Sequence, residues 1–129
     1  MAGTTAETVL CKSERFAVRI IRLYRHLCAG HREYDLFRQL LRSGTSIGAN
    51  LAEAEYAISR KDFLAKLSIA LKECRETQYW LRLLYATAYL NAPGFQSIFN
   101  DSEEIRKILS SSTKTIADSL KANGSQSDV

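Results

Sequence analysis

Residues 42–54 read RSGTSIGANLAEA, a run of small side chains that contains one asparagine and one glutamate. No strand pattern precedes the run and no phosphate-loop motif surrounds its glycines, so the segment is predicted to be helical. Glycine in a helix interior costs about 1 kcal/mol relative to alanine. We therefore expect another backbone or a bulky ring to lie against Gly44 and Gly48, and Asn50 and Glu53 to lie within the same packed contact.

Apolar residues recur at spacings of three and four on both sides of this run, which predicts further helices. Thr4 and Glu7 have the spacing of a capping box, and so do Ser59 and Asp62. The residues around Pro93, the single proline, are expected to end a helix. The expected helices cover residues 5–29, 34–58, 59–91 and 101–122, followed at 123–129 by a polar tail that we expect to be disordered.

Long helices with short connections predict an all-α, antiparallel up-down-up-down four-helix bundle, formed by one domain over residues 1–122. The third helix carries surplus aromatic side chains, Tyr79 and Trp80, which indicate self-association or simply complete the core. On the same helix, Lys72 and Glu76 have the spacing of a supporting ion pair, on a face that is solvated or lies between protomers.

The composition is that of one ordinary globular domain of 129 residues with a formal net charge of +4. No run of apolar residues is long enough for a membrane span, and the N-terminus lacks a signal-peptide pattern, so we expect a cytoplasmic protein. Three cysteines lie far apart among apolar helical positions, which is typical of buried structural thiols.

Basic residues recur along the first predicted helix at spacings of three and four, so they share one side of it. Such a stripe suits contacts with successive phosphates, and arginine suits bidentate ones. A solvated helix face gives the same pattern, and that alternative stays open. The stripe consists of Lys12, Arg15, Arg19, Arg22 and His26, with Arg25 beside it.

A metal or catalytic site is not expected. Glu53, Glu73 and Glu76 supply carboxylates, but a di-iron bundle needs Glu-x-x-His on two helices, and neither His26 nor His31 follows a glutamate at that spacing. The sequence also lacks a nucleophile elbow. We expect no enzyme activity and no cofactor.

The two polar residues of the small-residue run, Asn50 and Glu53, are interpreted as structural and not as part of a binding site. Asn50 and Glu53 lie one turn apart, so we expect them to bond to each other's neighbours or to pair with Arg42 or Arg75.

Three segments of this sequence resemble one known family. They are Tyr34-x-Leu36 with Gln39-Leu40-x-Arg42-Ser43-x-x-Ser46-Ile47-x-Ala49-Asn50-x-Ala52-Glu53, then Arg60-Lys61-Asp62-Phe63, then Ser68-Ile69-Ala70-Leu71-Lys72-Glu73 with Glu76-Thr77-x-Tyr79-Trp80-Leu81. The chain resembles the four-helix-bundle proteins encoded in the intervening sequences of bacterial 23S ribosomal RNA genes. It departs from the family pattern at Leu51, usually Ile, and at Ala54, usually Gly.

The resemblance implies a ring of protomers, commonly a homopentamer, without known enzymatic activity and with a suspected role in nucleic-acid binding. Accessory proteins of diversity-generating retroelements are similar to this family and work with a reverse transcriptase and its RNA. One hypothesis is therefore an oligomer that binds RNA or DNA through a set of basic residues, which are Lys12, Arg15, Arg19, Arg22, Arg25 and Arg32. The other is a protein-interaction scaffold whose basic charge is incidental.

Overall fold

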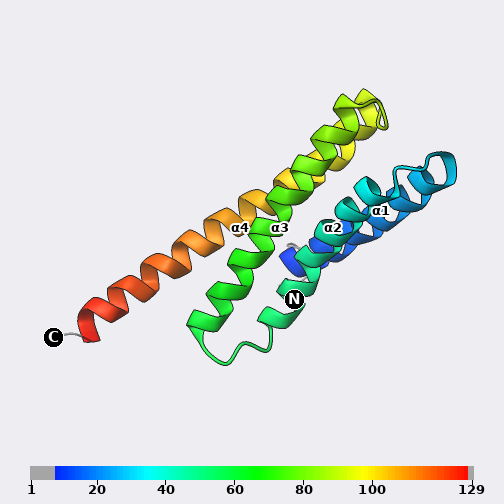
Figure 1. The fold of residues 1–129 in the computed structure, drawn as a ribbon. Helices are drawn as coiled ribbons and strands as arrows, with labels where there is room; N and C mark the ends of the chain where they lie inside the picture. Colours follow the sequence, from blue (N-terminus) through cyan, green and yellow to red (C-terminus); the bar gives the residue numbers. More distant parts are fainter. Residues whose placement is uncertain (1–7, 128–129) are drawn as a thin grey trace, which may run out of the picture.

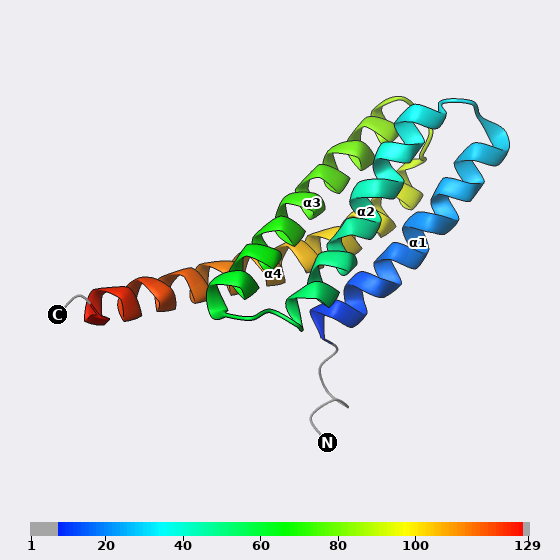
Figure 2. The ribbon, with the colours of Figure 1, turned by 60° about the horizontal axis from the view of Figure 1, so that its bottom comes forward.

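The structure, a computed structural model, describes residues 8–127. Its helices are α1 (Val9–Gly30), α2 (Tyr34–Ala54), α3 (Arg60–Ala86) and α4 (Ala92–Ser127). They run alternately up and down (Figures 1 and 2), and each packs against two others: α1 on α2 and α4, and α3 on α2 and α4. The predicted all-α four-helix bundle is confirmed.

Apolar side chains from all four helices fill the space between them and form one continuous core. Their spacing follows the helical period, so each helix turns one face inward. The largest fully buried apolar side chains are Phe16, Ile20, Leu27, Phe37, Leu40, Ile47, Leu81, Leu84, Ile105 and Leu109.

The first helix begins later than predicted. Thr8 is extended and its hydroxyl accepts a hydrogen bond from the Cys11 amide at 3.1 Å, so α1 starts at Val9 and not near residue 5. The capping pair proposed for Thr4 and Glu7 lies outside the described residues.

The turn between α2 and α3 confirms one predicted cap and shortens the predicted second helix. The Ser59 hydroxyl accepts from the Asp62 amide at 3.0 Å, and the Asp62 carboxylate accepts from the Ile58 amide at 3.2 Å. These bonds hold the chain extended ahead of α3. The second helix therefore ends at Ala54 and not near Ile58.

The segment that we expected to end the third helix begins the fourth. The Asn91 side chain accepts a hydrogen bond from the Gly94 amide at 2.8 Å, which caps α4. Pro93 then lies in the first turn, where a missing backbone donor does no harm. The fourth helix therefore starts at Ala92 and not near Asp101.

The third helix stops at Ala86 in a Schellman motif, earlier than the predicted residue 91. The Tyr89 amide donates to the Leu84 carbonyl at 2.9 Å, and the Ala88 amide donates to the Tyr85 carbonyl at 3.1 Å. This motif requires a left-handed residue, and Ala88 fills the position with a φ of 67°. An L-residue with a Cβ is strained there.

We expect Ala88→Gly to stabilise the protein by about 1 kcal/mol, because glycine adopts the left-handed conformation without a steric penalty. Ala65→Gly, at an exposed position inside α3, is the control, since the same change within a helix should destabilise by about 0.5–1 kcal/mol. Urea unfolding of both variants measures the two effects. A loss of stability in Ala88→Gly would contradict the assignment.

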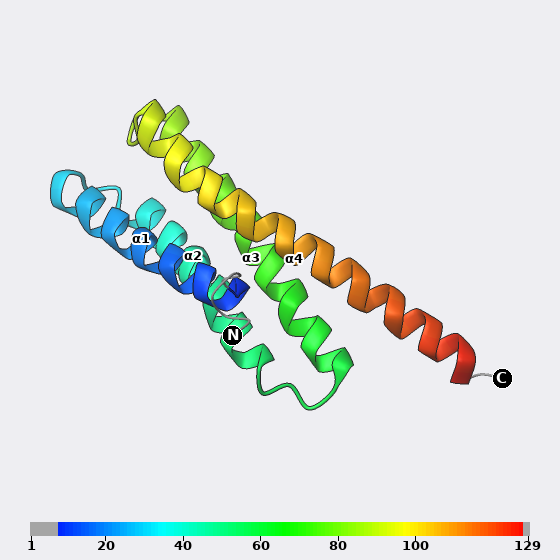
Figure 3. The same cartoon turned by 180° about the vertical axis from the view of Figure 1, so that it is seen from behind.

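The fourth helix continues to Ser127 and its last turns extend beyond the start of α3 (Figures 2 and 3). It thus includes residues 123–127, which we expected to belong to a disordered tail; residues 128–129 lie outside the described part. Propagating an existing helix adds one hydrogen bond per residue, and no proline interrupts this stretch. Ile116, ahead of this overhang, is half-buried and packs against the core, and Leu120 is half-buried as well.

The small-residue run packs α2 against α1. A Cβ on Gly44 would lie 2.8 Å from Cγ2 and 2.9 Å from Cγ1 of Ile20, a fully buried side chain. A Cβ on Gly48 would lie 3.6 Å from Cβ and 3.7 Å from the backbone of Ser13. The predicted close contact is confirmed, although the group against Gly44 is aliphatic and not a ring.

The two glycines predict opposite substitution effects. Gly44→Ala should destabilise the protein by about 1–2 kcal/mol, because Ile20 is stiff at χ1 and has no free space to move into. Gly48→Ala should stabilise it by up to about 1 kcal/mol, since its Cβ makes ordinary contacts and alanine favours the helix. Thermal unfolding of both variants checks this. Equal shifts in the two would contradict the packing described.

Candidate nucleic-acid interface

The predicted stripe on α1 lies along the seam with α4, and α4 carboxylates hold two of its cations. Lys12 forms an ion pair with Glu104. Arg19 pairs with Asp101 at 2.6 Å and donates to the Ser97 hydroxyl at 3.0 Å. Part of the stripe therefore joins two helices of the same chain.

The remaining predicted cations are more accessible. Arg15 is exposed beside Asp101 and Glu104 in the same seam. Arg22 and Arg25, further along α1, and Arg32, in the turn after it, are also exposed. Within the described residues, no carboxylate pairs with these last three. They remain available for an anion, whereas Lys12 and Arg19 are already neutralised.

Sequence reasoning missed the α4 partners because it placed Asp101 at a helix start. There, a carboxylate would complement the positive end of the helix dipole. Since α4 begins at Ala92, Asp101 and Glu104 lie one turn apart in the helix interior and on the side toward α1. Only the antiparallel register between α1 and α4 brings them to Lys12 and Arg19.

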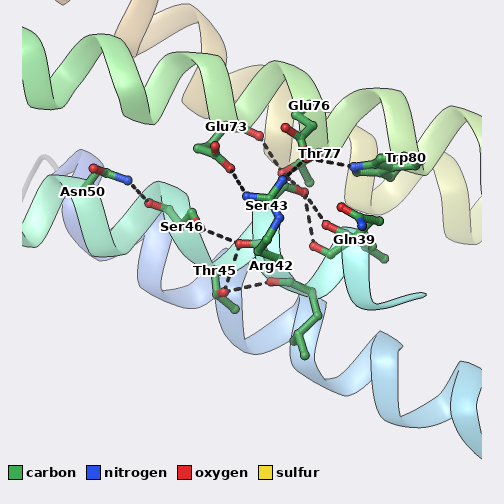
Figure 4. A network of polar contacts seen from close by, with 12 residues as sticks. Gln39, Arg42, Ser43, Thr45, Ser46, Asn50, Glu73, Glu76, Thr77 and Trp80 are labelled. Atoms are coloured by element: carbon green, nitrogen blue, oxygen red, sulfur yellow. Dashed lines mark hydrogen bonds and ion pairs between the residues drawn. The ribbon is translucent and has the colours of Figure 1, made fainter. Parts of the chain in front are cut away.

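The carboxylates of α3 are held by an arginine of α2 (Figure 4). Arg42 Nη1 lies 3.4 Å from Glu73 Oε2, and its Nη2 pairs with Glu76 Oε2. The Trp80 indole donates to that same Glu76 oxygen at 3.2 Å. Glu76 therefore pairs with α2, and the expected Lys72–Glu76 pair is not formed.

The pairing predicted for Asn50 and Glu53 is partly wrong. The Asn50 amide donates to the Ser46 carbonyl at 2.8 Å within α2, and Glu53 pairs with Lys66 at 2.9 Å. Neither residue pairs with Arg42 or Arg75. A hydrogen bond of 3.0 Å from Thr77 Oγ1 to Ser43 Oγ is the buried polar link between α2 and α3 at this level (Figure 4).

The residues predicted to pack helices or protomers have different surroundings. Gly44 and Gly48 are buried against α1 of the same chain, while Asn50 and Trp80 are half-buried. Tyr79 is 47% exposed. Contacts of these residues with a second protomer stay a prediction.

A charged cluster joins α3 to α4. Arg106 donates to both carboxylate oxygens of Glu103, at 2.7 and 2.9 Å, and the Gln78 amide donates to Glu103 at 2.7 Å. Hydrogen bonds from Arg106 and then from Gln78 favour the charged form and lower the pKa of Glu103 from 4.5 to about 2.

The lowered pKa makes stability depend on pH. A carboxyl whose folded pKa lies below its unfolded pKa stabilises the protein fully above the unfolded value, so this contribution disappears as the pH falls from about 4.5 to about 2. We expect Glu103→Gln to lower the melting temperature at pH 7 and to converge with the original protein near pH 2.

Asp118→Asn is the control for this experiment, because Asp118 is exposed on the overhang and has no ion pair in the described part of the chain. Its melting temperature should follow that of the original protein over the whole pH range. A constant difference between Glu103→Gln and the original protein would show that Glu103 does not carry this dependence.

The cysteines differ in burial. Cys74 is fully buried and its thiol donates to the Ser102 carbonyl at 3.4 Å; burial raises its pKa to about 12. Cys28 is half-buried, but Cys11 is exposed, which corrects the expectation that all three are buried.

The described helices and polar side chains bear on two alternative functions, a membrane span and a metal site. No helix there combines the length and apolar character needed to cross a bilayer. No group of three histidine, cysteine or carboxylate side chains within residues 8–127 is arranged to hold a metal ion.

The fold and the exposed cations define a small, basic, all-α bundle protein. Residues 7–111 match the family of 23S rRNA-intervening sequence proteins, and the chain belongs to this family. The resemblance inferred from the three segments is therefore confirmed.

A solved structure shows the same fold. It is the 1.70 Å crystal structure of a protein of unknown function from the S23 ribosomal protein family of Bacteroides thetaiotaomicron. It is 54% identical in sequence, with a TM-score of 0.81, over 83% of this chain and 99% of that one. No match was found among curated proteins. The part of α4 from residue 112 onward lies outside the family match.

Proposed function

We propose that this protein binds nucleic acid as a non-catalytic homo-oligomer. The observation that carries the proposal is the group of exposed arginines at the end of α1, Arg22, Arg25 and Arg32, which have no carboxylate partner within residues 8–127. The formal net charge of +4 has the sign that phosphate attracts.

The proposed contact set is narrower than the predicted stripe. Lys12 and Arg19 form ion pairs with α4, so a phosphate would have to displace a carboxylate to reach them. Arg22 and Arg25 meet no such competition. Their guanidinium groups suit bidentate phosphate contacts, which bind the backbone without reading base sequence.

Assembly strengthens this proposal. The family resemblance implies a ring, commonly of five protomers, and each copy would contribute the same arginines. Several weak sites that engage one polyanion bind far more tightly than one site does. A reverse transcriptase and its RNA are the partners that the retroelement form of this proposal requires.

The test compares the original protein with Arg22→Glu/Arg25→Glu in binding to a labelled structured RNA across a salt series. Because affinity falls steeply with salt for each phosphate neutralised, we expect the double variant to lose at least tenfold in affinity and to show a shallower salt dependence. The mass in solution, measured on the same samples, reports the assembly.

Arg60→Glu/Lys61→Glu is the matched control, since it makes the same change in net charge with two exposed cations at the start of α3. It should weaken binding much less than the α1 variant. Equal losses in both variants would mean that total charge, and not the α1 arginines, decides binding. No binding by the original protein at low salt would refute the proposed function.

The alternative function is a protein-interaction scaffold, and one surface favours it. Tyr56 and Ile58, in the turn between α2 and α3, are 84% and 93% exposed. They lie at the end of the bundle where Phe63, Leu67 and Ile116 line an apolar groove. Exposed apolar side chains beside such a groove are typical of protein contacts.

A further inference from the structure

A second charged surface follows the outer side of α3. Four exposed residues, Lys72, Arg75, Tyr79 and Arg82, recur at spacings of three, four and three, so they form one line along the helix. We name this line the α3 stripe. At 1.5 Å per residue it is about 15 Å long. It consists of three cations and one aromatic ring, a combination different from the all-cationic stripe on α1.

The carboxylates closest to the α3 stripe form ion pairs with other arginines, so they do not pair with its cations. Glu73 and Glu76 are the carboxylates nearest in sequence, and Arg42 holds both of them on the side toward α2. Across the α3–α4 seam, Glu103 is held by Arg106. Within the described residues, Lys72, Arg75 and Arg82 form no ion pair.

The ring of Tyr79 is half-exposed and supported on one edge. Its centroid lies 4.9 Å from that of Trp80, with an angle of 65° between the planes, and the Trp80 indole is fixed by its hydrogen bond to Glu76. A ring held in this way loses little conformational freedom when another ring stacks on it. Its 47% exposure leaves surface for that contact.

We infer that the α3 stripe binds single-stranded nucleic acid: a base stacks on Tyr79 while Lys72, Arg75 and Arg82 contact the flanking phosphates. Alternation of aromatic and cationic side chains is the chemistry by which proteins bind unpaired strands. Duplex bases are stacked inside the helix and cannot reach Tyr79. This inference rests on the proposed function and specifies its ligand as an unpaired strand, such as a loop.

The experiment measures binding of the full chain to a 12-nucleotide uridine oligomer and to a 12-base-pair RNA duplex. Fluorescence of Trp80, the single tryptophan, reports directly on the neighbourhood of Tyr79. We expect the single strand to change this fluorescence and the duplex to leave it unchanged. Tyr79→Ala should lose about tenfold in affinity for the single strand, the order expected for one stacked base.

Tyr79→Phe is the matched control, because it keeps the ring and should keep the affinity. Lys72→Glu/Arg75→Glu/Arg82→Glu should weaken binding and reduce its salt dependence.

If the original protein binds RNA but Tyr79→Ala binds the oligomer equally well, the stripe assignment is wrong and the proposed function stands. If the original protein binds neither probe, both fail. A changed mass of Tyr79→Ala in solution would assign the ring to a contact between protomers and overturn the inference.

Discussion

The close approach of α1 and α2 is the constraint on which the rest of the bundle depends. At Gly44 the absence of a Cβ leaves room for Ile20, which a methyl group there would approach to 2.8 Å. Interiors are packed at the density of organic crystals, so this spacing cannot be widened without a loss of contacts elsewhere. The position of α1 on α2 then determines which of its flanks faces α4. The place of α1 in the bundle therefore depends on the missing methyl group of Gly44.

Pairing within the chain sorts the charges over the surface. Asp101 and Glu104 on α4 hold Lys12 and Arg19, while Arg42 of α2 holds the carboxylates of α3. Each pair is partly exposed, so its direct contribution to stability is small. The larger effect of these ion pairs is to determine which cations on the surface stay unpaired. Unpaired cations remain at the end of α1 and along the outer side of α3, where the two candidate contacts with nucleic acid lie.

The sequence predicted what depends on local spacing. Helical periodicity, the Ser59 cap and the close contact at the small-residue run all follow from residues a few positions apart, and the structure confirms them. The segment at residues 91–94 was misread because proline and glycine favour a helix end and, equally, a first turn. The hydrogen bond of Asn91 decides between them, and that bond is not visible in composition.

The candidate sites were harder to predict because they depend on the distance between helices. The spacing of Lys72, Arg75, Tyr79 and Arg82 is visible in the sequence. Whether these cations are unpaired depends on Arg42, which forms ion pairs with Glu73 and Glu76 on the side of α3 that faces α2. Those ion pairs depend on how α2 and α3 are aligned, which the sequence does not reveal. The sequence likewise predicts Lys12 and Arg19 as contacts for nucleic acid, because their carboxylate partners Glu104 and Asp101 lie in a distant part of the chain.

The order of contacts in the bundle also bears on how it forms. Three of its four helix contacts join consecutive helices, and the α1–α4 seam alone brings the first helix to the last. Contacts between consecutive helices close short loops at a small cost in entropy, whereas the seam joins Lys12 to Glu104 and closes a much longer loop. Opposite charges attract over a longer range than apolar side chains do. The ion pairs of Lys12 and Arg19 thus attract the first and the last of the described helices toward each other.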